Sequence, residues 1–249
     1  GMKMVSSDGR KNPKLTAPQG ACDTHLHFYN AKFPSAPTAL MTPPDAWVDD
    51  YCLIQHRLNL ERIVAIQPTT YGTDNSCQLE AMKAFGKNAR GVMVADTSTS
   101  DEELDRLTRL GARGVRFHML PGGALPWDIL EEMAARVHNF GWHLQLQMNG
   151  REFPDREEML KRLPCDLVVD HVGRFMGPVP TDDPAFKVLL GFLETGRCWV
   201  KLSAPYESSE SGPPDGADIT AEARVLVQAA PTHAVGKQLA ASWSEKSTG

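Results

Sequence analysis

The sequence predicts a single domain of the α/β class, built on a parallel sheet. Short runs rich in β-branched residues alternate with amphipathic helical segments along nearly the whole chain, and polar side chains gather where these runs end. A chain of 249 residues, of which 41% are hydrophobic, can bury one substantial core. Seven β/α units in series are most simply the repeats of a TIM-type (β/α)8 barrel.

The strands of this sheet are predicted from the short β-branched runs. Their alternation with helical segments implies that they lie parallel and are covered by helices. The predicted strands comprise residues 21–27, 62–67, 91–96, 114–119, 143–148, 167–171 and 198–203.

The segments between the strands predict the covering helices. Ser100 and Glu103 have the spacing of a capping box, and Gly86, Gly111 and Gly141 stand where helix-terminating glycines belong. The predicted helices comprise residues 44–58, 76–86, 100–110, 126–140, 151–163, 184–194 and 219–229.

The composition excludes several functional classes. A formal net charge of -5 offers no basic face for nucleic acid. No apolar run approaches the roughly 18 residues that a membrane span needs. The five cysteines are scattered without a Cys-x-x-Cys pair, which is typical of a reduced, cytoplasmic protein. We therefore expect a small-molecule partner, neither nucleic acid nor membrane, and leave open whether the chain forms a homo-oligomer.

Two histidines close the first predicted strand. Side chains alternate faces along a strand, so His25 and His27 point the same way and lie about 6.5 Å apart. Taken alone, the pair has two interpretations of equal weight: part of a functional site, or two histidines on a solvated strand end.

Polar residues follow the other predicted strands as well, at the end where barrel enzymes carry out their chemistry. Imidazoles or cations at the ends of four strands repel one another unless an anionic group lies among them. The set therefore indicates a site for an anionic ligand. Besides the first pair, its candidates are Tyr71, Arg116, His118, Gln145, His171, Arg174, Lys201 and Tyr206.

Several motifs, taken in order, resemble the lactone-processing branch of the amidohydrolase superfamily, which includes 2-pyrone-4,6-dicarboxylate lactonases and D-galactarolactone isomerases. The resemblance runs from about residue 20 to about residue 231. The motifs are Asp23-Thr24-His25-Leu26-His27, Gln67-Pro68 with Tyr71-Gly72-Thr73-Asp74-Asn75, Gly114-Val115-Arg116-Phe117, Asp170-His171-Val172-Gly173, and Val200-Lys201-Leu202-Ser203-Ala204-Pro205-Tyr206.

The resemblance implies a distorted (β/α)8 barrel that acts on a lactone. His25, His27 and His171 would surround the lactone carbonyl as catalytic residues, and Arg116 would hold a substrate carboxylate. Imidazole donors that converge on a carbonyl stabilise the negative charge that develops when it is attacked, and a guanidinium can bind a carboxylate in two places. The substrate-binding set would also include His118, Gln145, Arg174, Lys201, Tyr206 and Tyr71.

We expect no cofactor and no metal, because several members of this branch need none. Zinc on His25 and His27 is the alternative. A closed mononuclear zinc site requires a third or fourth ligand and usually a carboxylate base, and the aspartate that the superfamily carries on its eighth strand is not visible in this sequence.

The eighth strand is the main departure from the family. Where a motif like Trp-Gly-Ser-Asp/Asn-Trp-Pro-His is expected, residues 233–242 form a poor strand. Reading their codons one nucleotide later permits Met-Leu-Trp-Ala-Ser-Asn-Trp-Pro-His-Pro, so we infer a frameshift near Thr232 and expect a barrel that lacks a proper last strand. The domain division is then residues 1–20 as an N-terminal extension, 21–232 as the amidohydrolase-like barrel, and 233–249 as a non-family tail.

At the position of the catalytic aspartate of the eighth strand, the shifted reading permits asparagine but not aspartate. An asparagine there would activate water weakly. A hydroxyl of the substrate could still attack the polarised carbonyl and give a lactone of another ring size. Pro121-Gly122-Gly123 stands where dicarboxylate lactonases carry a further basic residue, which favours one substrate carboxylate. We therefore expect an isomerase of a D-galactarolactone-type sugar lactone. The alternatives are a hydrolytic lactonase and an inactive barrel that binds an acidic ligand.

Overall fold

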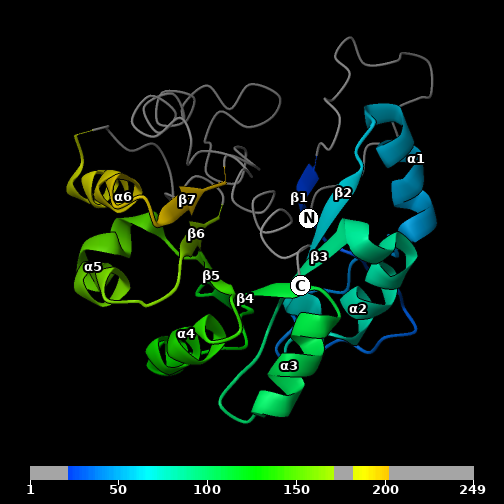
Figure 1. Cartoon of the computed structure of the whole chain (residues 1–249), viewed down its shortest axis with the longest axis horizontal. Coiled ribbons are helices and arrows are strands. Elements are labelled where there is room, and N and C mark those ends of the chain that lie inside the picture. The colour runs from blue at the N-terminus through cyan, green and yellow to red at the C-terminus, as the bar shows by residue number, and fades with distance from the viewer. Residues whose placement is uncertain (1–21, 171–181, 202–249) are drawn as a thin grey trace.

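In the part of the chain that the structure describes, seven parallel strands form one sheet in which spatial order follows chain order. The computed structural model describes residues 22–170 and 182–201. Figure 1 shows the sheet curving into an arc with the helices on its outer side, so the predicted parallel α/β architecture is confirmed. The strands are β1 (Cys22–Leu26), β2 (Arg62–Ile66), β3 (Ala89–Met93), β4 (Ala112–His118), β5 (His143–Gln147), β6 (Leu167–Val169) and β7 (Cys198–Val200).

Helices connect successive strands, as predicted. They are α1 (Val48–Leu58), α2 (Ser76–Met82), α3 (Asp101–Arg109), α4 (Leu130–His138), α5 (Phe153–Lys161) and α6 (Pro184–Glu194). Three predicted helices are shorter because one end is a 3₁₀ turn: η2 (Lys83–Asn88) follows α2, η3 (Trp127–Ile129) precedes α4, and η4 (Gly150–Glu152) precedes α5. A further 3₁₀ turn, η1 (Thr69–Tyr71), follows β2. The predicted helix 219–229, the predicted end of the seventh strand and the 233–242 segment lie outside the described residues.

The predicted helix ends are confirmed in their backbone geometry. Gly86, Gly111 and Gly141 have φ values of 53°, 111° and 75°, which glycine adopts without steric cost. Ser100 caps α3 by accepting the Glu103 N–H at 3.1 Å. The Glu103 carboxylate pairs with Arg106 at 2.7 Å.

Each strand places one set of side chains against the helices and the other inside the arc. On β2, Ile63 and Ala65 join the large core between sheet and helices. Val64 and Ile66 point the other way and pack with Val92 in a small inner cluster. The inner side is therefore apolar at β2 and β3. Around β4 to β7 the buried polar residues are Arg116, His143, Gln145, Gln147, Asp170 and Lys201.

A search of the described residues for a helix long and apolar enough to cross a membrane found none.

Candidate active site

A bulge in β1 directs the two histidines into the arc. Asp23 pairs with Ile63 and Leu26 with Ala65, so β1 carries one residue more than β2 between these points. The extra residue reverses the alternation of side chains. Without it His25 would share the outer face with Asp23, which accepts a hydrogen bond from Tyr51 of α1 at 3.0 Å. The Asp23 carboxylate also accepts the His25 N–H at 3.2 Å, which holds the bulge in place.

The two imidazoles converge. Nε2 of His25 lies 3.2 Å from Nε2 of His27, with the rings almost perpendicular. Nδ1 of His27 lies 2.7 Å from the carbonyl oxygen of Ile66. The predicted common face of the pair is confirmed. The ring centroids lie 4.9 Å apart, and the Nε2 atoms come closer than the roughly 6.5 Å strand repeat because the two rings point towards each other.

Lys201 reaches the pair from the opposite end of the described sheet. It immediately follows β7, is 3% exposed, and places Nζ 3.3 Å from Nδ1 of His25. Asp170, which follows β6, lies between the cations: its Oδ1 is 4.0 Å from Nζ of Lys201 and its Oδ2 is 3.9 Å from Nε of Arg116. Gln145 donates to Asp170 Oδ2 at 3.0 Å. Burial lowers the pKa of Lys201 to about 8, although Asp170 opposes the shift.

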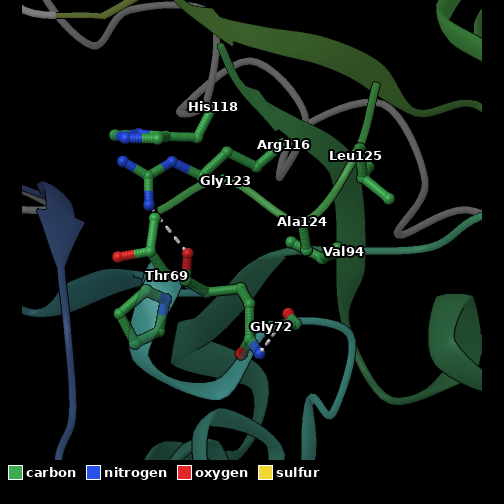
Figure 2. Close-up of a pocket in the computed structure, with 10 residues that line it drawn as sticks. Thr69, Gly72, Val94, Arg116, His118, Gly123, Ala124 and Leu125 are labelled. Carbon is green, nitrogen blue, oxygen red and sulfur yellow. Dashed lines mark hydrogen bonds between the residues drawn. The ribbon is translucent and has the colours of Figure 1, made fainter. Parts of the chain in front are cut away.

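Arg116 is held by the residue that follows β2 and by the last residue of β5. Its guanidinium donates to the Gln67 carbonyl at 2.9 Å and to Gln147 Oε1 at 2.8 Å. His118 also contacts Gln147 Oε1, at 3.1 Å, and its ring lies over the guanidinium in Figure 2. Because an amide oxygen only accepts, His118 carries its proton on Nδ1.

Arg116 and His118 border a small pocket at the carboxyl end of β4. The pocket, drawn in Figure 2, is also lined by Gln67, Thr69, Gly72, Val94, Gly123 and Leu125. A Cβ atom on Gly123 would overlap the His118 carbonyl oxygen, so this position admits no side chain. The pocket thus combines a cation, an imidazole and backbone, which suits a small acidic molecule.

The remaining predicted site residues are Tyr71, His171, Arg174 and Tyr206. Tyr71 lies in η1 and its hydroxyl is bonded to the backbone of Asn30, accepting at 3.1 Å and donating at 3.2 Å. Tyr71 therefore stabilises the loop that follows β1. His171, Arg174 and Tyr206 lie outside the described residues.

Three buried polar residues beside these side chains were not among the predicted site residues: Asp170, Gln147 and His143. Asp170 and Gln147 join the predicted residues together. His143, at the start of β5, fills the space that Gly114 leaves on β4: a Cβ on Gly114 would lie 2.6 Å from the imidazole. Burial lowers the pKa of His143 to about 4. The available signal was the spacing of His143, Gln145 and Gln147, which puts all three on one face of a strand.

The described residues do not form a complete metal site. Among residues 22–170 and 182–201, no group of three or more His, Cys, Asp or Glu side chains could hold an ion. His25 has an ammonium group at its Nδ1 instead of the hydrogen-bond acceptor that usually supports a metal-bound imidazole. Within residues 22–170 and 182–201, the side chains around His25 and His27 therefore do not make up a zinc site.

Comparison with known proteins agrees with this architecture. The family model described as Amidohydrolase matches residues 22–234. D-galactarolactone isomerase of Agrobacterium fabrum is 31% identical over 225 residues, covering 90% of this chain and 77% of the relative. 2-Pyrone-4,6-dicarboxylate hydrolase of Comamonas testosteroni is 35% identical over 206 residues, covering 81% and 68%.

A crystal structure of an Agrobacterium tumefaciens protein in its apo form superimposes with a TM-score of 0.82 at 30% identity, covering 90% of this chain and 82% of the other. The sequence motifs, the parallel sheet and the family match agree. The chain belongs to the amidohydrolase family.

Proposed function

We propose that this protein is a metal-independent isomerase that changes the ring size of an acidic sugar lactone of the D-galactarolactone type. The observation that carries the proposal is the convergence of His25 and His27 at 3.2 Å beside two buried cations, Arg116 and Lys201. An imidazole N–H aimed at a lactone carbonyl stabilises the charge that develops when a hydroxyl attacks it. The similarity to a D-galactarolactone isomerase supports this substrate class.

The charge of the site supports an anionic substrate. Arg116 and Lys201 are both within 4.0 Å of Asp170, so this group of three buried residues carries a surplus of one positive charge. A substrate carboxylate would neutralise that surplus, which favours binding because buried charge is stable only when paired. Gly123 contributes backbone alone to the pocket, which supports one carboxylate better than two.

In the proposed reaction a hydroxyl of the substrate attacks the carbonyl carbon of its own lactone. The new ester bond forms as the old one breaks, and the proton of the attacking hydroxyl ends on the released one. Atoms and charge therefore balance without water. Holding both groups in one molecule gives the attack a large effective concentration.

Hydrolysis is the second candidate, because a relative that is 35% identical is a 2-pyrone-4,6-dicarboxylate hydrolase. A pH-stat experiment separates the two. Hydrolysis of a lactone at neutral pH releases one proton, whereas isomerisation releases none. We expect the D-galactarolactone signals in a ¹³C NMR spectrum to change without base consumption. Base consumption equal to the lactone consumed would establish hydrolysis instead.

A further inference from the structure

Lys201 constrains the proton of His25. The Lys201 ammonium lies 3.3 Å from Nδ1 of His25, closer than Oδ1 of Asp170 at 3.8 Å. A protonated lysine has three N–H donors and no acceptor. A favourable contact therefore requires a lone pair on Nδ1, and a neutral His25 then carries its proton on Nε2.

The other end of the pair gives an independent constraint. His27 Nδ1 lies 2.7 Å from the Ile66 carbonyl oxygen, which only accepts. A neutral His27 therefore carries its proton on Nδ1 and a lone pair on Nε2. The 3.2 Å contact between the two Nε2 atoms needs one proton, and only His25 can supply it. Both constraints select the same form of His25.

We propose that Lys201 is a positioning residue that fixes His25 as a hydrogen-bond donor at Nε2 and leaves His27 as an acceptor at Nε2. The opposite form of His25 would direct an N–H at an ammonium group and oppose two lone pairs at 3.2 Å. The pair is thus asymmetric: His25 can donate to a lactone carbonyl, and His27 can accept the proton of the attacking hydroxyl. These two roles rest on the proposed function, whereas the proton positions do not.

The same arrangement explains why the pair does not fit a metal. An imidazole that binds a metal presents a lone pair at one nitrogen and donates from the other to an acceptor. His27 meets this condition through Ile66, but His25 faces Lys201. An acceptor in place of the ammonium should move the proton of His25 from Nε2 to Nδ1. Nε2 of His25 would then present a lone pair, as Nε2 of His27 does, and the two nitrogen atoms could bind one metal ion.

The direct test is ¹⁵N NMR of the full chain with labelled histidine, without substrate. His25→Gln and His27→Gln variants serve to assign the signals. We expect wild-type His25 to be protonated at Nε2 only and His27 at Nδ1 only. A proton on Nδ1 of His25, or averaging over both nitrogens, would overturn the proposal. Correct proton positions in a chain that does not convert lactones would contradict the proposed function alone.

Variants of Lys201 give a second readout. Lys201→Met should mix the two forms of His25 and lower kcat about 100-fold, the loss typical of a misplaced oxyanion donor, while Lys201→Arg, also a donor, should keep His25 protonated at Nε2. Lys201→Gln can turn its amide oxygen towards Nδ1 of His25, and should then raise zinc affinity at least tenfold in calorimetry. His25→Ala in that background should abolish the gain. Unchanged His25 signals in Lys201→Met would overturn the proposal, as would unchanged zinc affinity in a Lys201→Gln variant whose His25 proton has moved to Nδ1.

Discussion

The hydroxyl of Tyr51 on α1 donates a hydrogen bond of 3.0 Å to Oδ2 of Asp23 on β1. The other oxygen of Asp23 holds the backbone N–H of His25. A helix on the outside of the sheet thereby stabilises the bulge that directs His25 inward.

This contact predicts that Tyr51→Phe lowers kcat by about tenfold with little change in KM, because a small displacement of an imidazole weakens its transition-state contact. Stability should fall by about 1 kcal/mol. A double-mutant cycle with Asp23→Ala measures the coupling. Additive effects of the two substitutions on kcat would mean that the hydroxyl does not act through Asp23.

Arg116 is expected to bind a substrate carboxylate. Arg116→Ala should weaken binding of an acidic lactone by about 1.5–3 kcal/mol, the value of a charge-assisted hydrogen bond. Arg113→Ala is the matched control, because Arg113 is also on β4 but bonds to the Thr108 and Ala112 carbonyls. Calorimetry on folded variants is the measurement, and equal affinity of Arg116→Ala and wild type would refute the assignment.

Gly123 should tolerate no side chain. Gly123→Ala would force a methyl group against the His118 carbonyl, so we expect a loss of about 1–3 kcal/mol in unfolding free energy, as in other overpacked sites. Gly191→Ala is the control: it lies in α6 with nothing within 4 Å of the added atom, and should be neutral or stabilising by up to about 1 kcal/mol. Urea unfolding compares them, and similar stabilities would show that the turn can move aside.

His143 should make the fold sensitive to acid. Its pKa falls from 6.5 to about 4 on burial, so between these values the unfolded chain binds more protons and stability decreases as pH falls. The full loss is about 3 kcal/mol. His143→Gln removes this contribution. The difference in unfolding free energy between wild type and variant should therefore shift by about 2–3 kcal/mol between pH 7 and pH 4.5, and a constant difference would contradict the buried neutral imidazole.

The alternation of residue types was sufficient to predict the parallel sheet and its helices, since each strand and helix buries its own apolar side chains. It also placed Arg116 and Gln145 on the strands that became β4 and β5. The β1 bulge could not be predicted, because an extra residue leaves no mark in a short polar motif. The contact of Lys201 with His25 depends on the curvature of the sheet, which brings the end of β7 towards β1. From the sequence alone, the Asp170 carboxylate could equally have been a hydrogen-bond acceptor for backbone N–H groups.

We expect no stoichiometric zinc in protein purified without chelator. Elemental analysis should give well below one equivalent, and treatment with a chelator should leave lactone turnover intact. Tightly held zinc whose removal abolishes turnover would replace the proposed chemistry by metal-assisted hydrolysis.

In the proposed isomerisation, the acyl group moves to another hydroxyl of the same substrate molecule and not to water. The most direct measurement is turnover of D-galactarolactone in ¹⁸O-enriched water, followed by mass spectrometry, with an enzyme-free sample as the control for spontaneous hydrolysis. We predict a lactone of different ring size that contains no ¹⁸O above the control. An open-chain acid with ¹⁸O in its carboxyl group, formed at the rate of lactone consumption, would show hydrolysis and contradict the proposed isomerisation.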